Sequence, residues 1–466
     1  MTIFNYIGIA GLGAAKTLQN NNKNVIVLEA SNRIGGRLKT NSSIFEVNNE
    51  TFPVDLGASW IHGVNGNSIT TLMNEMNGAY FVTDYDNSNF YDGSQLMNDT
   101  SVEDMYYLYE ETYAIVSNLQ DATYTEAQEE QGISLYDGFE IAFEDMQLTS
   151  SEERLVNFLI VDNIELEYAS SIEDLSLQWY DNDDDTNGVD YIFQGGYSTV
   201  SDYVGSDLNV RLGDAVTEVK YGSVSGDGDV ELWNYTVVKT AGGSEYHANK
   251  VVIAVPLGVL KLQDSTYTTP SIIQFTPSLS AIAPALNTSI SSLQMGVLEK
   301  TYLQFNTTFW PTDVEFIYLI DGSATSRYAL SNRTEILSFD YHVPGAHMLL
   351  VFESGRAAVS DDEEVSDAQR VNNIMHVSVT HYTSYTYTPT PIYAIIHTIY
   401  TQYPCIHLHV HTYTHTIITI YTIIIGIERS IPRCPRPHHL PPHQLAPRPI
   451  HIRILLLSQC WCRYKR

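Results

Sequence analysis

A glycine-rich stretch near the start of the chain limits its possible folds more than any other feature. In YIGIAGLGAAKTL, Gly8 and Gly11 occupy the second and third glycine positions of a phosphate-binding turn, and Tyr6 occupies the first. The apolar run NVIVLEA then ends at Glu29, where an acid is placed to accept hydrogen bonds from a ribose. This order predicts a βαβ unit of a doubly wound, Rossmann-like domain. A solvated strand-end charge is the alternative for Glu29.

Small and basic residues follow this pattern directly. In EASNRIGGRLKT the pair Gly35–Gly36 lies between Arg33 and Arg37, and backbone N–H and guanidinium groups are donors that suit a diphosphate and an electron-rich ring edge. In VDLGASWIHGVNG the small residues 57–59 precede Trp60, and small side chains let a flat ring lie against the backbone. Both segments are therefore predicted to serve the same nucleotide.

Charge is distributed unevenly along the 466 residues. The net charge is −31, and residues 1–370 hold 54 of the 55 acidic side chains but only 16 of the 24 basic ones. Phosphate contacts need Lys and Arg, so this acidic body argues against nucleic acid as a partner. It concentrates cationic ligands near the surface, although an acidic surface that only keeps the protein soluble is the simpler alternative.

The sequence changes character after Arg370. Stretches such as THYTSYTYTPTPIYAIIHTIYTQY use little beyond Thr, His, Tyr and Ile, whose codons a translated dinucleotide repeat supplies. We therefore expect residues 371–466 to be an aberrant low-complexity tail, disordered or artefactual. His407, His409 and His411 share one strand face there and suggest zinc, but carboxylate support is nearly absent, so no metal site is predicted.

The sequence leaves the compartment open. The first residues lack a basic region followed by an apolar run, so no signal peptide is predicted. The longest apolar runs stay below the ~18 residues that a membrane-spanning helix needs, so no span is predicted. All four cysteines lie after Arg370, which excludes a disulfide framework from the preceding residues. The oligomeric state stays open as well.

Five motifs follow one another between Ile7 and Arg370: ExxxRxGGRxxT, DLGASWIHG, FQGGYSTV, VVIAVPLGVLK and MGVLEKTYLQF. In order and rough spacing they resemble the flavin-dependent amine oxidases, in particular polyamine oxidases of the spermine-oxidase type. The resemblance implies an α/β fold with two lobes, a doubly wound FAD-binding domain and an α+β substrate-binding domain. The implied segments are 1–72 and 190–262 for FAD binding, 73–189 (mainly helical) and 263–370 for substrate binding, and 371–466 for the tail.

The resemblance also implies roles for single residues. Lys300, in MGVLEKTYLQF, resembles the family lysine that holds a water near flavin N5, and His62 matches a histidine near the amine. Val216 would contact the adenine through its backbone, Glu29 the ribose, and Arg37 the phosphates and the flavin edge. The other residues implied in FAD binding are Gly8, Gly11, Arg33, Gly36, Gly57, Ala58, Ser59 and Trp60. A purely structural role is the alternative for Lys300, His62 and Trp60.

The implied reaction is FAD-dependent oxidation of a polyamine such as spermine or spermidine. An ammonium group cannot donate hydride, so the reacting amine must be neutral, which an apolar and partly desolvated pocket favours. Hydride passes from the α-carbon to flavin N5, the imine hydrolyses to an aldehyde and an amine, and dioxygen reoxidises the flavin to give hydrogen peroxide. The acidic loop 181–185 is a candidate for holding the distal ammonium groups, with a solvated loop as the alternative.

Two departures from the family pattern lower the expected affinity for FAD. Tyr6 replaces the first glycine, and a side chain there crowds the turn. The family's closing segment, of the type AGE…G…GA…SG, has no counterpart after Arg370, so we expect this polypeptide to bind FAD weakly or not at all. A truncated, catalytically inactive homologue is therefore one alternative. A flavin oxidase of the histone lysine demethylase type is another, although its long antiparallel helical insertion is not visible.

Overall fold

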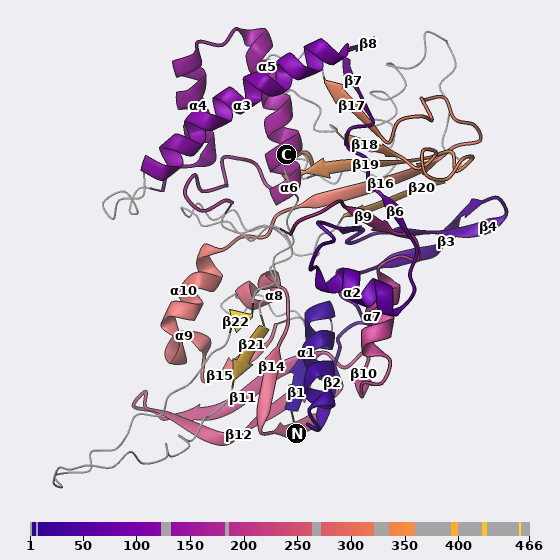
Figure 1. Ribbon diagram of the computed structural model, residues 1–466. Helices are drawn as coiled ribbons and strands as arrows, with labels where there is room; N and C mark the ends of the chain where they lie inside the picture. The colour runs from indigo at the N-terminus through magenta and orange to yellow at the C-terminus, as the bar shows by residue number, and fades with distance from the viewer. Residues whose placement is uncertain are drawn as a thin grey trace, which may run out of the picture. The chain divides into compact units, whose positions relative to one another are not determined.

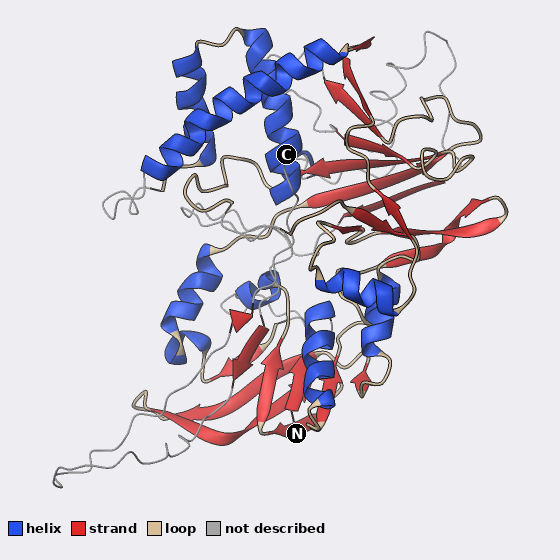
Figure 2. Ribbon diagram, in the orientation of Figure 1, coloured by secondary structure: helices blue, strands red, loops and turns tan. Residues whose placement is uncertain are grey.

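The described part of the chain forms two compact units of mixed helices and strands (Figures 1 and 2). The computed structural model describes residues 2–5, 8–122, 132–181, 186–262, 272–320, 335–358, 393–398, 422–425 and 456–457. Unit 1 comprises the described residues within Met1–Gly36, Ser201–Ile290 and Ile420–Gln459, and unit 2 those within Arg37–Val200 and Ser291–Thr419. This mixture of helices and sheets agrees with the predicted α/β class.

Unit 1 is built on a six-stranded sheet. In spatial order its strands are β10 (Val210–Arg211), β2 (Val25–Leu28), β1 (Thr2–Asn5), β14 (Lys250–Ile253), β21 (Thr422–Ile425) and β22 (Leu456–Leu457). The first four run parallel to one another, and α1 (Ile9–Asn20) joins β1 to β2. All residues of β2 are buried, which is typical of a parallel strand covered on both faces. The predicted strand–helix–strand unit is therefore confirmed.

A second sheet and several short helices complete unit 1. The sheet contains, in spatial order, β13 (Glu245–Ala248), β12 (Val230–Thr240), β11 (Val216–Val224) and β15 (Gln274–Thr276). The helices are α8 (Leu257–Lys261), α9 (Leu279–Ile282) and α10 (Pro284–Ser292), and α7 (Ser198–Gly205) leads from unit 2 into unit 1. The run KVVIAVPLGVL forms β14 and then α8, with Pro256 as the cap residue of that helix.

Unit 2 contains a seven-stranded sheet that carries Lys300. In spatial order its strands are β20 (Tyr393–Thr398), β16 (Leu298–Gln304), β19 (Met348–Ser354), β18 (Glu335–Ser338), β17 (Phe316–Ile320), β7 (Ser88–Asp92) and β8 (Gln95–Leu96). Two smaller sheets pair β3 (Thr40–Val47) with β4 (Glu50–Asp55), and β5 (Trp60–Ile61) and β6 (Tyr80–Val82) with β9 (Tyr191–Phe193). Helix α2 (Ser68–Glu75) follows β5.

The longest helices of unit 2 lie in one stretch of sequence and pack on one another (Figure 2). They are α3 (Asp99–Ala122), α4 (Leu135–Met146) and α5 (Ser150–Ile160), and α5 continues into the π-helical turn η1 (Val161–Glu165) and α6 (Leu166–Tyr168). Capping boxes start α4 at Ser134 and α5 at Thr149, where each hydroxyl satisfies a free backbone N–H group.

The predicted helical region begins later than expected. The segment 73–189 is expected to be mainly helical, but its residues 80–96 form the strands β6, β7 and β8. Strand β7 pairs in parallel with β17, more than two hundred residues further along the chain. This part of the prediction is wrong because such a distant partner leaves no trace in local periodicity.

The core of unit 2 forms where its helices meet the large sheet. Phe139 and Phe158 come from the helices, and Tyr302, Phe316 and Tyr318 come from the sheet. The rings of Phe90 and Tyr318 are stacked at 4.5 Å. Burial of each such side chain contributes roughly 1.5–3 kcal/mol, so this core holds β16 firmly in place.

Several predictions concern residues outside the described ranges. They include Tyr6, most of the acidic loop and the histidines at 407, 409 and 411. Of residues 371–466 the structure describes only the strands β20, β21 and β22. The two units divide at residues 36/37, 200/201 and 290/291, so the predicted segment boundaries stay a prediction, as does the nature of the tail.

Candidate functional site

In unit 1 the glycine-rich turn leads directly into α1. Gly8 is the cap residue of this helix, in an extended conformation, and no side chain of the described residues caps the first N–H groups. A methyl group on Gly8 would meet no heavy atom within 4 Å. Free N–H groups at a helix N-terminus favour phosphate, because the helix dipole adds to their hydrogen bonds. Gly11 is buried in the first turn.

Glu29 lies at the end of β2, beside the turn that precedes β11. Its side chain is buried, and its carboxylate accepts a hydrogen bond from the Ser31 N–H group at 2.8 Å. Its backbone N–H group donates to the Arg211 carbonyl, and its carbonyl accepts from the Asp214 N–H group, both at 2.8 Å. These bonds hold the end of β2, which carries Glu29, beside the segment that leads into Val216. The carboxylate is therefore not a solvated charge.

The second glycine pair lies next to the first loop in unit 1. Gly8 and Gly35 form an isolated parallel bridge. Gly35 and Gly36 have φ values of 97° and 59°, a region that residues with a Cβ avoid, so this turn requires glycine. The Arg33 guanidinium donates to the carbonyl of Gly36 at 2.7 Å and thereby holds the turn closed.

In unit 2, Arg37 and Gly57 are in close backbone contact. The Ala58 N–H group donates to the Arg37 carbonyl at 3.4 Å, and a methyl group on Gly57 would lie 1.8 Å from that carbonyl oxygen. Burial lowers the pKa of the Arg37 guanidinium from its usual value. Within the described ranges, the structure shows no acceptor for a hydrogen bond from this guanidinium, which leaves it available to an anion.

Lys300 is buried at the centre of the candidate site in unit 2. Its Nζ donates to the Gly57 carbonyl at 2.6 Å and contacts the Ser59 hydroxyl at 2.5 Å. The same nitrogen lies 5.4 Å from the ring centre of Trp60 and 5.7 Å from that of Phe352, on the neighbouring strand β19. Burial lowers the pKa of Lys300 to about 8, and the charge of Asp55 opposes this shift. Lys300 is therefore not a surface lysine.

Asp55 ends strand β4 and is buried near Lys300. Its Oδ1 accepts from the Thr40 hydroxyl at 2.6 Å and from the Tyr197 N–H group at 2.9 Å. Tyr302, two residues after Lys300, donates its hydroxyl to the Asp55 carbonyl at 2.8 Å. Burial raises the pKa of Asp55 to about 6, although the bonds from Thr40 and Tyr197 and the charge of Lys300 oppose it. A buried carboxylate and a buried amine thus share one site.

His62 follows β5 and is oriented by a carboxylate. Its Nδ1 lies 2.9 Å from Asp190 Oδ2, which also accepts from the Tyr85 hydroxyl at 3.0 Å. The other oxygen of Asp190 accepts from the Gly63 N–H group at 2.8 Å. Burial raises the pKa of Asp190, but the bonds from His62, Gly63 and Tyr85 and the imidazole charge outweigh it, so the pKa is lowered overall. His62 is held in one orientation, which suits a structural or a functional role.

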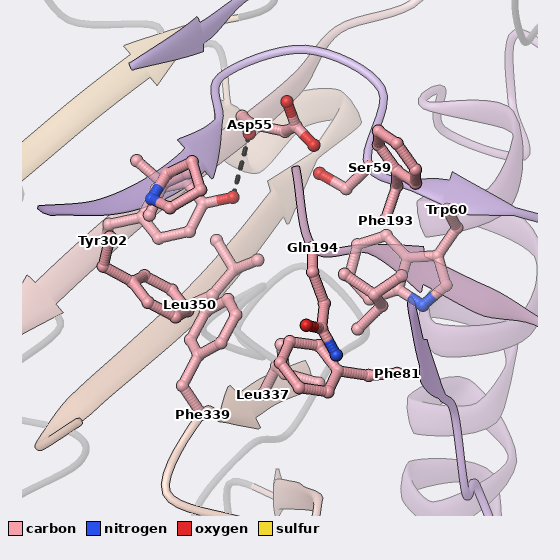
Figure 3. Close-up of a pocket in the computed structure, with 14 residues that line it drawn as sticks. Asp55, Ser59, Trp60, Phe81, Phe193, Gln194, Tyr302, Leu337, Phe339 and Leu350 are labelled. Atoms are coloured by element: carbon pink, nitrogen blue, oxygen red, sulfur yellow. Dashed lines mark hydrogen bonds between the residues drawn. The ribbon is translucent and has the colours of Figure 1, made fainter. Parts of the chain in front are cut away.

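A small pocket in unit 2 opens beside these residues (Figure 3). Asp55, Ser59 and Gln194 supply its polar lining. The rest of the wall is apolar or aromatic: Phe52, Pro53, Val54, Trp60, Phe81, Ile192, Phe193, Tyr302, Leu337, Phe339 and Leu350. Trp60 both lines the pocket and lies beside the Lys300 amine, and its place in flavin binding stays a prediction. The Asp55 carboxylate and a set of apolar and aromatic side chains therefore border the same small space.

Residue patterns alone do not single out Asp55, Tyr302, Phe352 or Asp190. Asp55 ends a strand two residues before the Gly57 turn, and Tyr302 lies two positions after Lys300 on the same strand face, so both had a local signal. Phe352 and Asp190 had none, because strand pairing brings them in from distant sequence.

The described part of the chain offers neither a cluster of metal-binding side chains nor a helix suited to a membrane. Within the described ranges, no group of three or more His, Cys, Asp and Glu side chains is arranged to bind a metal ion. No helix of that same part of the chain combines the length and apolar character needed to cross a membrane. Of the acidic loop, only Asp181 is described, and it accepts a hydrogen bond from Gln120 at 2.6 Å.

Comparison with known proteins identifies one matching family and several relatives. The family model "Flavin containing amine oxidoreductase" matches residues 9–398. Polyamine oxidase 4 of Oryza sativa subsp. japonica is 27% identical over 385 residues, which are 79% of this chain and 70% of that protein. Probable polyamine oxidase 4 of Arabidopsis thaliana is 30% identical over 385 residues (79% and 69%). Lysine-specific histone demethylase 2 of Homo sapiens is 26% identical over 381 residues (79% and 42%).

The family match covers most of the chain and includes residues of both units. It also runs past Arg370, to residue 398. The predicted family, enzyme class and cofactor are thereby confirmed. The chain belongs to the flavin-containing amine oxidoreductases and is an FAD-dependent amine oxidoreductase.

Proposed function

We propose that the chain oxidises a polyamine at a carbon–nitrogen bond, releasing an aldehyde, an amine and hydrogen peroxide. The observation that carries the proposal is the position of Lys300. This buried side chain is bonded to Gly57 and Ser59, 243 residues away from Gly57 in the sequence. The motifs DLGASWIHG and MGVLEKTYLQF, each suggestive on its own, thus meet at a single charged group beside an aromatic pocket.

The residues present in each unit fit FAD. In unit 1 the uncapped start of α1 and the open space at Gly8 suit a diphosphate, and the buried carboxylate of Glu29 suits a ribose. In unit 2 the desolvated Arg37 guanidinium suits an anion, and Trp60 with Lys300 suits the edge of a flat ring. The contacts in unit 1 would be supported by Gly11, Arg33, Gly36 and Val216. Those in unit 2 would be supported by Gly57, Ala58 and Ser59.

Bound FAD supplies the redox chemistry, because its isoalloxazine ring accepts a hydride at N5. The protein has three tasks. The aromatic and aliphatic side chains of the pocket would limit the access of water to the reacting amine. Lys300 would donate its remaining N–H group, the one that is not bonded to Gly57 or Ser59, to a water molecule. His62, fixed by Asp190, would orient the amine nitrogen.

Replacing Lys300 tests this assignment. Lys300→Met should slow anaerobic flavin reduction by a polyamine by about 100-fold, the scale expected for loss of a group that positions or transfers a proton. Lys23→Met, at an exposed position, is the matched control and should leave the rate unchanged. Equal rates in both variants would remove Lys300 from the mechanism.

The choice of substrate needs its own comparison. Relatives of this chain are named as polyamine oxidases and as lysine-specific histone demethylases. Spermine or spermidine should reduce the flavin under anaerobic conditions, whereas a peptide with a methylated lysine should leave it oxidised. Reduction by the peptide alone would replace the polyamine assignment with the demethylase-type alternative.

A further inference from the structure

Trp60 is held both by its backbone and by the nitrogen of its ring. Its carbonyl accepts a hydrogen bond from the Tyr197 hydroxyl, and its indole Nε1–H group donates to the Thr83 hydroxyl at 3.0 Å. We propose that Thr83 is a positioning residue that fixes the orientation of the Trp60 indole beside Lys300. The consequence for catalysis rests on the proposed function, whereas the orientation of the ring itself does not.

The orientation of the Trp60 ring matters because the Lys300 amine lies over it. The 5.4 Å from Lys300 Nζ to the ring centre is within the range in which a cation is attracted to an aromatic face. The ring of Phe352 lies 5.7 Å from that of Trp60 and borders the same amine. Figure 3 shows the indole in the pocket wall, with its nitrogen on the side away from Asp55. The bond to the Thr83 hydroxyl therefore holds the ring from behind the pocket.

Thr83 is a fixed acceptor, because the short segment around it is bonded on all sides. Its side chain is buried, and its N–H group donates to the Asp190 carbonyl at 2.9 Å. The N–H group of the next residue, Asp84, donates to the buried Glu315 carboxylate at 2.7 Å. The hydroxyl of Tyr85 donates to Asp190 Oδ2 at 3.0 Å. The backbone thus sets the place of the Thr83 hydroxyl, and the indole orients toward it.

A second tryptophan of unit 2 makes the same kind of bond away from the pocket. The Nε1–H group of Trp310 donates to the Ser338 hydroxyl, also at 3.0 Å. Trp310 belongs to a separate core cluster, and among the described residues that line the pocket there is neither Trp310 nor Ser338. Loss of either hydroxyl leaves a tryptophan N–H group without its partner, which lowers stability. Only the loss at Thr83 should also disturb Lys300, so the two sites separate positioning from stability.

The NMR shift of the Lys300 side chain reports the ring orientation in the full chain without added FAD. The ring current of Trp60 displaces the signals of the Lys300 Cε protons, which Lys300→Arg identifies. Thr83→Val keeps the shape of the side chain but removes the hydroxyl, and should move these signals toward the values of an exposed lysine. Thr83→Ser keeps the hydroxyl and should leave them in place. Unchanged Lys300 signals in folded Thr83→Val overturn the proposal.

Flavin reduction in the FAD-loaded protein measures the consequence for catalysis. Thr83→Val should slow the limiting rate of anaerobic reduction by spermine roughly tenfold, because a displaced ring misplaces the groups around the reacting atoms. The matched control Ser338→Ala should lower the urea midpoint by a similar amount but leave this rate and the Lys300 signals unchanged. Equal effects of the two variants on the rate overturn the proposal, since the bond at Thr83 would then serve stability alone.

A second background keeps the test valid if Thr83→Val does not fold. Trp60→Phe removes the indole N–H group, so that no donor is left unpaired when Thr83→Val is added to it. In this background Thr83→Val should change neither the Lys300 signals nor the rate of flavin reduction, because the bond through which it acts is absent. A further change on adding Thr83→Val overturns the proposal. The NMR shifts need no oxidation, so their outcome is separate from that of the proposed function.

Discussion

The backbone at Gly57 leaves no room for a side chain. A methyl carbon there would lie 1.8 Å from the Arg37 carbonyl oxygen and 2.9 Å from its carbon, and neither backbone atom can rotate away. Gly57 also presents its own carbonyl to Lys300. The smallest substitution at this residue therefore disturbs both the loop and the lysine.

Gly57→Ala should lower the free energy of unfolding by about 1–3 kcal/mol, the usual cost of forcing extra volume into a packed site. Gly226→Ala, where a methyl group meets no heavy atom within 4 Å, is the matched control and should change stability by less than ~0.5 kcal/mol. Urea unfolding of the two variants measures the difference. Equal stability of both would show that the loop adapts freely.

Single residues also show what can and cannot be predicted from the sequence. Lys300, Glu29 and Gly8 were found because each lies in a motif with a recognisable local order. Asp190, which orients His62, was not found, because the two residues are 128 positions apart and only strand pairing joins their segments. A local pattern identifies a residue, but its partner is determined by the fold.

At the scale of elements, two glycines occupy different positions along α1. Gly8 and Gly13 both have open space where a Cβ would stand, and neither has a positive φ. Gly8 precedes the helix at the end that favours phosphate, whereas Gly13 lies inside it. The same substitution should therefore affect folding and cofactor binding differently at the two positions.

Gly8→Ala should leave stability near that of the unsubstituted chain but weaken FAD binding, because the methyl group occupies the approach of the diphosphate. Gly13→Ala should stabilise the helix by roughly 0.5–1 kcal/mol and leave FAD binding unchanged. Equilibrium dialysis with FAD measures both affinities. Equal affinities in the two variants would mean that the start of α1 does not contact the diphosphate.

The elements that the sequence predicted best are those whose pairing partners are near in sequence. β1, α1 and β2 form one continuous unit, and α5 begins at a capping box that is readable in the local sequence. The strands β6 to β8 were missed, since β7 pairs with β17 across a long stretch of chain. Residues 80–96 carry Asn, Asp and Gly in short turns, which local rules do not assign to a sheet.

At the scale of the whole molecule, the Asp55–Lys300 pair makes stability depend on pH. The pKa of Asp55 is raised in the folded state, so its contribution to stability is lost as the pH rises through about 6. The pKa of Lys300 is lowered, so its contribution is lost as the pH falls through about 8. The contributions of Asp55 and Lys300 to the free energy of unfolding are therefore both smallest between about pH 6 and about pH 8.

The double variant Asp55→Asn with Lys300→Met removes this dependence. Its free energy of unfolding relative to the unsubstituted chain should be highest between about pH 6 and 8 and should fall on either side. Urea unfolding of both proteins from about pH 4 to about pH 10, between the ordinary pKa values of the two side chains, measures the difference. A difference that is constant with pH would show that the two groups do not titrate with folding.

The central claim is that this chain uses FAD to oxidise an amine, and one measurement tests it most directly. The full chain is incubated with excess FAD, freed of unbound flavin and mixed anaerobically with spermine or spermidine. The sequence alone favours weak or no FAD binding, whereas the open start of α1 and the buried Glu29 carboxylate fit the cofactor. The account therefore predicts that protein-bound flavin absorption appears, is bleached by the amine, and returns with hydrogen peroxide when oxygen is admitted. Flavin that stays bound but oxidised with either amine, or a protein that retains no flavin from excess FAD, would contradict it.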